Sequence, residues 1–202
     1  RCLVVGAGAM GSTWIRRFLP NFADRIEITG IVDVDRSKVD AAAEFLGFDR
    51  SKRFITTTSG FASGDPDFCV VCVPPAAHRA VVVAACGRQV PILCEKPISD
   101  SWDNTLMMYR AVKSTDVKMQ VIQNYRYSAP MVTFRDVLRS GDLGRINYVV
   151  SRFRQDYREP LSWGAAFRHE IPHALLIEGS VHHFDMLRNL TGGDCATPVS
   201  YT

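Results

Sequence analysis

The chain has 202 residues, enough for one large domain or for one complete domain and part of a second. Its residues are 47% hydrophobic and 22% charged, a composition typical of a folded globular protein. Its formal net charge is only +3 and it has no run of five basic residues, so its charge does not favour nucleic-acid or membrane-surface binding. No stretch approaches the roughly 18 apolar residues of a transmembrane helix.

Short β-rich runs alternate with segments of helical length through the first 123 residues, the pattern of a doubly wound parallel sheet. The predicted strands are Cys2–Val5, Ile26–Asp33, Phe54–Thr56, Phe68–Val73, Ile92–Cys94 and Lys118–Gln123. The predicted helices are Met10–Leu19, Ser37–Leu46, Ala77–Cys86 and Ser101–Lys113. Pro20, Gly47 and Gly87 follow three of these helices, as expected where helices end. Residues 1–123 are therefore expected to form one α/β domain.

The pattern changes from residue 124 onward. A helix is predicted at Pro130–Arg139, followed by a long strand at Ile146–Arg154 whose partial alternation is typical of a half-exposed antiparallel sheet. A loop over residues 157–172 leads to a last helix at Leu176–Leu190. Because one strand cannot form a stable sheet, we expect residues 124–202 to form an incomplete α+β substrate domain.

Six cysteines are scattered through the chain, at Cys2, Cys69, Cys72, Cys86, Cys94 and Cys195. Most lie in apolar segments, which indicates reduced thiols in a cytoplasmic protein rather than a disulfide framework. Cys69 and Cys72 have the spacing of metal ligands. Alternation along a strand places their side chains on opposite faces, however, so core packing is the favoured interpretation.

Gly6, Gly8 and Gly11 lie between the first predicted strand and the first predicted helix. In such a turn the first glycine allows the tight bend, the second lets the backbone approach a pyrophosphate, and the third permits close packing of helix on strand. Ala9 and Met10 complete the turn, where free N–H groups favour a phosphate. The pattern predicts a dinucleotide-binding site, and a glycine-rich turn without a ligand is the alternative.

Asp33 ends the second predicted strand, 22 residues after Gly11. A carboxylate at this place hydrogen-bonds the ribose hydroxyls of a dinucleotide. It also repels a 2′-phosphate, which favours NAD over NADP. Arg36 lies three residues further on and can offset this repulsion, so NADP stays open as the alternative cofactor.

Two more loops follow predicted strands at the same edge of the sheet. Val73, Pro74, Pro75 and His78 follow the fourth strand, and Glu95, Lys96 and Pro97 follow the fifth. Open parallel sheets bind ligands beyond the carboxyl ends of their strands, so these residues are expected to border the cofactor. Because it follows the fifth strand, Lys96 is expected where cofactor and substrate meet. An ammonium group at that place can polarise a hydroxyl or carbonyl oxygen. A surface lysine in a turn is the alternative.

Glu178, His182 and Asp185 are spaced i, i+4 and i+7 in the last predicted helix and therefore share one face. This stripe is either a solvated row of ion pairs or the lining of a cleft, and the apolar residues between its members favour the cleft. Adjacent helical residues diverge by about 100°, so His183 points elsewhere, with core or interface packing as its expected role. For the same reason no metal site is predicted here.

These motifs follow one another in an order that continues through Gly141-Asp-Leu-Gly144, and the sequence resembles the Gfo/Idh/MocA family over essentially its whole length. The resemblance implies a Rossmann domain that binds NAD(P), joined to a substrate domain. It also implies an enzyme that oxidises or reduces carbinol carbons of sugars, cyclitols and related polyols. The family's catalytic set corresponds to Lys96, His182 and Asp185, with Glu178 where many members have aspartate. The Lys96–Pro97 bond is often cis in this family.

The resemblance extends to further site residues and to partners. His78 is expected beside the cofactor. The residues expected to border the substrate, each with a structural role equally open, are Asn124, Tyr125, Arg126, Arg168 and His173. We expect a small-molecule substrate, no nucleic-acid or membrane partner, and a homo-oligomer (dimer or tetramer) when the protein is full length. Two other functions remain open: a non-catalytic NAD(P)-binding regulator, which should lack the lysine or the histidine, and a glycosidase with tightly bound NAD.

Overall fold

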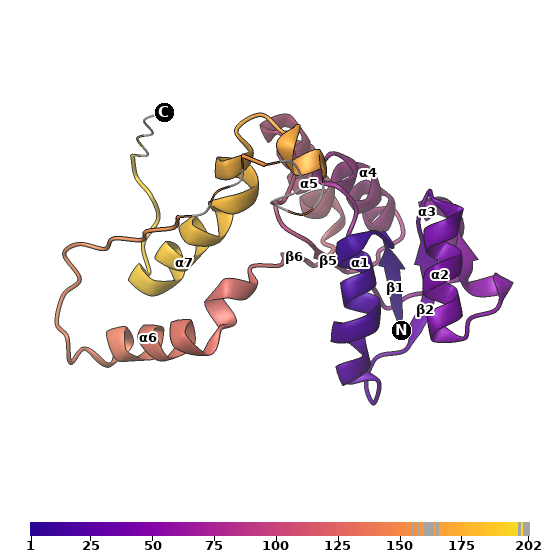
Figure 1. Ribbon diagram of the computed structural model, residues 1–202, viewed down its shortest axis with the longest axis horizontal. Helices are drawn as coiled ribbons and strands as arrows, with labels where there is room; N and C mark the ends of the chain where they lie inside the picture. The colour runs from indigo at the N-terminus through magenta and orange to yellow at the C-terminus, as the bar shows by residue number, and fades with distance from the viewer. Residues whose placement is uncertain (155, 157, 160–163, 165, 198, 200–202) are drawn as a thin grey trace. The chain divides into compact units, whose positions relative to one another are not determined.

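The computed structural model describes residues 1–154, 156, 158–159, 164, 166–197 and 199. The chain divides into two units, Arg1–Ile122 and Gln123–Thr202 (Figure 1).

The first unit is built on a six-stranded parallel sheet (Figure 1). Its strands are β1 (Cys2–Val5), β2 (Ile28–Val32), β3 (Arg53–Phe54), β4 (Phe68–Val71), β5 (Ile92–Cys94) and β6 (Met119–Val121). They lie in the order β3-β2-β1-β4-β5-β6. This order confirms the predicted doubly wound sheet, in which the chain winds outward in one direction from β1 and in the other from β4.

Helices connect the strands of this sheet. They are α1 (Ala9–Thr13), which continues as a π-helical turn at Trp14–Phe18 and a 3₁₀ turn at Leu19–Phe22, then α2 (Arg36–Leu46), α3 (Thr57–Ser63), α4 (Pro75–Cys86) and α5 (Trp102–Thr115), with a short 3₁₀ turn at Arg50–Lys52. The side chains of Asp35, Thr56 and Ser101 accept hydrogen bonds from backbone N–H groups at the starts of α2, α3 and α5. The sequence did not predict α3, because its Ser, Thr and Gly residues are typical of a loop.

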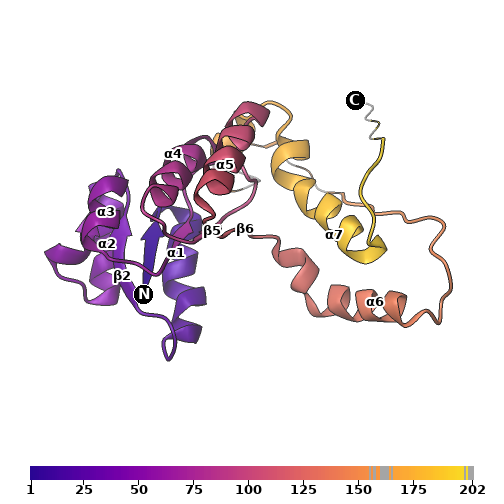
Figure 2. The ribbon, with the colours of Figure 1, turned by 180° about the vertical axis from the view of Figure 1, so that it is seen from behind.

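The core lies on both faces of the sheet. Helices α1 and α2 cover one face, while α4 and α5 cover the other together with α3 (Figure 1, Figure 2). Successive residues of a strand alternate between the faces. Cys69 therefore packs in one core cluster and Cys72 in the other, which confirms that this pair is part of the core.

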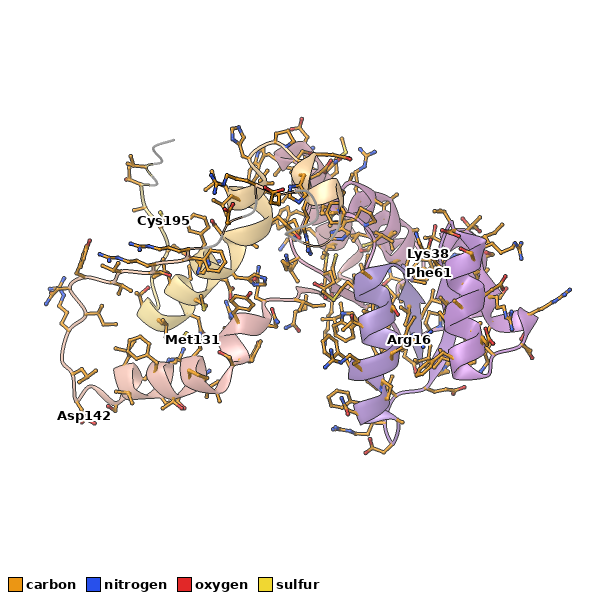
Figure 3. The ribbon with its side chains drawn as sticks, viewed as in Figure 1. Arg16, Lys38, Phe61, Met131, Asp142 and Cys195 are labelled. Atoms are coloured by element: carbon orange, nitrogen blue, oxygen red, sulfur yellow. The ribbon has the colours of Figure 1, made fainter. Side chains whose placement is uncertain are left out.

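All six cysteines are free thiols. Five of them are buried, and burial raises the pKa of Cys2 and of Cys94 to about 12. The sixth, Cys195, is exposed in the segment after α7 (Figure 3). Thiols with so high a pKa stay protonated near neutral pH, which makes them poor nucleophiles and suits a packing role.

The second unit contains helices and connecting segments. A 3₁₀ turn at Asn124–Tyr127 is followed by α6 (Ala129–Ser140), a 3₁₀ turn at Ala166–His169, a π-helical turn at Leu175–Gly179 and α7 (Val181–Thr191) (Figure 1). The predicted helix at Leu176–Leu190 is therefore interrupted at Ser180, which follows Gly179, a residue with a weak preference for helix. The predicted loop over residues 157–172 falls partly outside the described residues.

The strand predicted at Ile146–Arg154 is wrong, since residues 146–154 have no regular secondary structure. A β-strand needs a neighbouring strand to receive its backbone hydrogen bonds. Within the described residues of the second unit no such neighbour is present. Tyr148 is 85% exposed, so its side chain has little packing to fix the backbone.

The helices of both units are short, and the longest described one is α5, with 14 residues. Over the part of the chain that the structure describes, no helix combines the length and the apolar character needed to cross a lipid bilayer.

Gly6 is expected to be essential to the first unit. Its φ is +100°, and a Cβ atom there would lie 2.6 Å from the carbonyl carbon of Cys72. We predict that Gly6→Ala lowers the free energy of unfolding by about 3 kcal/mol, measured by chemical denaturation of the full-length protein. Gly47→Ala is the control, because Gly47 also has a positive φ (+67°) but a Cβ atom there would meet no neighbouring atom within 4 Å. Equal losses in the two variants would contradict the prediction.

Candidate functional site

The carboxyl ends of four neighbouring strands carry the residues that the sequence singled out in the first unit. Val5 is paired with Val32 of β2 and Val71 of β4, and Val71 is paired with Cys94 of β5, so these strands end at one edge of the sheet. The glycine turn, Asp33, the Val73–Pro75 loop and the Glu95–Lys96 loop all follow these ends. We call this set of loops the rim. The strand order reverses here, between β1 and β4, which is where doubly wound sheets bind ligands.

The glycines of the turn differ in what surrounds them. A Cβ atom on Gly11 would lie 1.9 Å from the carbonyl oxygen of Gly6, so protein packing accounts for both of these glycines. A Cβ atom on Gly8 would meet nothing within 4 Å, and the φ of Gly8 is −66°, which any residue can adopt. Packing and backbone conformation therefore leave Gly8 unexplained. A ligand that approaches the backbone closely would explain it, which fits a pyrophosphate.

Asp33 ties β2 to the glycine turn. Its Oδ2 accepts a hydrogen bond from the backbone N–H of Ala7 at 2.7 Å, and its Oδ1 accepts one from the N–H of Asp35 at 2.9 Å. A carboxylate has about four lone-pair sites, so these two bonds leave acceptor capacity for the hydroxyls of a ribose. The same carboxylate can thus shape the turn and bind a dinucleotide.

Glu95 ties the loop after β5 to the helical segment after α1. Its Oε1 accepts a hydrogen bond from the indole N–H of Trp14 at 2.9 Å, and its Oε2 accepts one from the backbone N–H of Lys96 at 3.3 Å. Lys96 is half-buried, and the Lys96–Pro97 bond is cis, as expected. The sequence did not single out Trp14, and its separation of 81 residues from Glu95 offers no local signal.

His78 bridges two loops of the rim. The side chain is completely buried, with its Nε2 2.9 Å from the carbonyl oxygen of Val73 and its Nδ1 3.1 Å from that of Ile98. Burial lowers the pKa of this imidazole. The bridge connects the loop after β4 with the loop that carries Lys96, which favours a structural role for His78 over direct contact with a cofactor.

In the second unit, two carboxylates of the predicted stripe pair with arginines. The Nε of Arg168 lies 2.5 Å from the Oε1 of Glu178, whose side chain is 1% exposed. Arg126 binds Asp185 through two nitrogens, with its Nε 2.7 Å from Oδ2 and its Nη2 in contact with Oδ1. This pairing raises the pKa of the Arg126 guanidinium. The stripe is therefore largely buried and is not the solvated row that was its alternative.

His182 lies between these two carboxylates along the chain and is 7% exposed. Its imidazole stacks on the ring of Tyr125, with ring centroids 4.0 Å apart and an angle of 7° between the planes. Tyr125 belongs to the 3₁₀ turn at Asn124–Tyr127. His183 points elsewhere, as predicted, and its ring is tilted against Phe153 at a centroid distance of 5.0 Å.

Asn124 and His173 are the remaining residues predicted to border the substrate. Asn124 is exposed at the start of its turn. His173 is exposed with a φ of +53°, and its carbonyl oxygen accepts hydrogen bonds from the N–H groups of Leu176 and Ile177. Among the described residues, no three His, Cys, Asp or Glu side chains gather in a way that could hold a metal ion.

The parallel sheet, the glycine turn and the carboxylate after β2 define a nucleotide-binding α/β protein. Residues 1–123 match the family described as "Oxidoreductase family, NAD-binding Rossmann fold", and residues 131–201 match the GFO/IDH/MocA C-terminal domain. The chain belongs to the Gfo/Idh/MocA oxidoreductase family.

Individual relatives agree with this assignment. The chain is 37% identical over 204 residues to the uncharacterized protein y4oX of Sinorhizobium fredii, covering 100% of this chain and 56% of that protein. It is 28% identical over 193 residues to inositol 2-dehydrogenase 1 of Paenarthrobacter aurescens, covering 95% and 54%. The WlbA dehydrogenase of Chromobacterium violaceum, solved with NADH and UDP-GlcNAcA, shares the fold with a TM-score of 0.76 at 23% identity, covering 94% and 55%. The chain thus spans about half the length of the curated relatives it matches.

The open space at Gly8 leads to a test of cofactor binding. We predict that Gly8→Ala in the full-length protein weakens NAD binding at least about tenfold, because the new methyl group enters the space that the pyrophosphate needs. The melting temperature should stay within about 2 °C, since a Cβ atom at this position would meet no protein atom within 4 Å and the φ of Gly8 suits alanine. Calorimetric titration and thermal unfolding measure the two effects. Unchanged NAD affinity would show that this opening is not used.

Proposed function

We propose that the full-length protein is an NAD-dependent oxidoreductase that acts on a carbinol or carbonyl carbon of a sugar, cyclitol or related polyol. The observation that carries the proposal is the rim, where the open glycine turn, the Asp33 carboxylate and the Lys96 loop follow neighbouring strands of one sheet. The inositol 2-dehydrogenase among the relatives supports the substrate class.

The residues of the rim fit a dinucleotide. Gly8, Ala9 and Met10 would hold its phosphates through backbone N–H groups, and Asp33 would accept hydrogen bonds from a ribose. The loop Val73–Pro75 would lie along the cofactor. When bound, the nicotinamide ring supplies the hydride acceptor or donor.

Cofactor choice depends on the charge at Asp33. A 2′-phosphate beside this carboxylate would be repelled, which supports NAD as the cofactor, with NADP as the alternative. Arg36 is exposed on α2 and can pair with a phosphate, so it is the residue that would permit NADP.

Lys96 and His182 divide the chemistry at the substrate oxygen in this proposal. The ammonium group of Lys96 stabilises negative charge as it develops on the oxygen, and the imidazole of His182 accepts the hydroxyl proton. Glu178 matches the acid of the family's catalytic set. Its ion pair with Arg168 supports a role in positioning this part of the chain.

The identity of the polyol depends on side chains around the reacting carbon. Asn124, Arg126, Arg168 and His173 remain the proposed substrate neighbours, and Arg126 and Arg168 already pair with carboxylates. An arginine held in this way presents its remaining N–H groups in a fixed direction, which suits recognition of hydroxyl or carboxylate oxygens.

The proposal also includes a cellular compartment and an oligomeric state. The five buried free thiols support a reducing, cytoplasmic location. We propose a homo-oligomer, dimer or tetramer, with a small-molecule substrate and no nucleic-acid partner, in line with the low net charge of +3.

Lys96 provides the test of catalysis. Lys96→Met in the full-length protein should lower kcat by about 10²-fold or more and leave the NAD dissociation constant within about twofold, because the ammonium acts on the reacting oxygen. Lys113→Met, which changes an exposed lysine of α5, is the matched control. The assay is a panel of polyols and sugars with NAD and NADP. NAD binding without turnover on any of them would favour the non-catalytic regulator.

Asp33 provides the test of cofactor choice. Asp33→Ala should weaken NAD binding by about tenfold and narrow the preference for NAD over NADP, because both a hydrogen-bond acceptor and a negative charge are lost. Asp33→Asn removes the charge and keeps one acceptor oxygen, so it separates the two effects. Titration calorimetry with both cofactors measures them. Parent-like affinities in both variants would contradict the assignment.

A further inference from the structure

We infer that Tyr125 is a positioning residue for His182. Its ring fixes the plane of the imidazole, the group that accepts the proton. The inference rests on the proposed function, in which His182 accepts the substrate proton. The sequence indicated Tyr125 only as a residue that could border the substrate, and nothing in it pointed to a contact with His182.

The first observation is the geometry of the two rings. The planes are within 7° of parallel and the centroids are 4.0 Å apart, which is a face-to-face arrangement and not an incidental edge contact. His182 is buried, whereas Tyr125 is 43% exposed. The tyrosine ring therefore covers one face of the imidazole and separates that face from solvent.

The second observation is that the next residue along the chain acts on the same helix. Arg126 holds Asp185 through two nitrogens, and Asp185 lies three residues after His182 on α7. Residues three apart on a helix are neighbours on its surface. The 3₁₀ turn at Asn124–Tyr127 thus holds α7 at two positions about one helical turn apart, by a ring stack at His182 and by an ion pair at Asp185.

A stack restricts χ2, the torsion that sets the plane of a histidine ring. The χ2 angle of histidine is broad, so a buried imidazole can rotate about its Cβ–Cγ bond unless a neighbour prevents it. A parallel ring restricts this rotation and keeps both nitrogens in a fixed plane. Because proton transfer needs a short, well-aligned donor and acceptor, free rotation would lower the fraction of productive complexes.

The test compares an aromatic with a non-aromatic replacement in the full-length protein. Tyr125→Phe keeps the ring and should retain kcat within about twofold. Tyr125→Leu removes it and should lower kcat by about tenfold to a hundredfold, with the KM for NAD unchanged within about twofold. Tyr109→Leu, at an exposed tyrosine of α5, is the matched control and should behave like the parent.

A spectroscopic measurement reports the stack itself. In protein labelled with [ε1-¹³C]histidine, the His182 resonance, assigned through His182→Asn, should be shifted upfield by the tyrosine ring. The shift should persist in Tyr125→Phe and be lost in Tyr125→Leu. If the leucine variant does not fold, an upfield shift in both the parent and the phenylalanine variant, with parent-like kcat in the latter, supports the inference. A His182 resonance at its ordinary position in the parent overturns it.

The outcomes separate the inference from the proposed function. If His182→Asn abolishes turnover and Tyr125→Leu keeps parent-like kcat, the positioning role of Tyr125 is wrong and the function of His182 stands. If His182→Asn retains turnover, the catalytic role of His182 is wrong, and a ring shift would then show that the stack is only structural.

Discussion

Backbone packs directly on backbone at Gly6, and the first unit depends on this contact. The end of β1 lies against the backbone of Cys72 after β4, and Gly11 of α1 lies against the carbonyl oxygen of Gly6. No side chain fits between these three segments. The approach draws the chain into a turn whose next glycine, Gly8, faces open space. The turn that packs against the core at Gly6 therefore also carries, at Gly8, the open space in which we propose that a dinucleotide binds.

Side chains of the rim then hold the loops around this opening. Asp33 binds the glycine turn, Glu95 binds Trp14, and His78 connects the carbonyl oxygens of Val73 and Ile98. Each tie joins loops that follow different strands or helices. A site that is ordered during folding loses less entropy when its ligand binds, so these bonds favour affinity even where they do not touch the ligand. Asp33 shapes the rim in this way and is also the residue proposed to bind the ribose of the cofactor.

The periodic and glycine-rich features of this chain were predictable, and the long-range contacts were not. Alternation and helix length located all six strands of the first unit, and the glycine turn with Asp33 located the rim. The bonds Trp14–Glu95 and Arg126–Asp185 span 81 and 59 residues, and no local pattern encodes them. The strand predicted at Ile146–Arg154 is wrong because a local pattern alone does not determine a strand. Its local pattern suits a strand, but pairing is decided by a neighbour that the pattern does not contain.

The contacts in the second unit explain how one polar stripe can serve two purposes. Glu178 and Asp185 each bind an arginine, and removing one partner of a buried ion pair costs more than the pair contributes, because a charge is left uncompensated. Such carboxylates suit anchoring. His182 is held by the flat face of its ring against Tyr125, while the nitrogens of an imidazole lie at its edge. A hydrogen bond restrains a ring through one of its nitrogens, whereas a stack restrains the plane of the ring through contacts on its face and does not itself use either nitrogen.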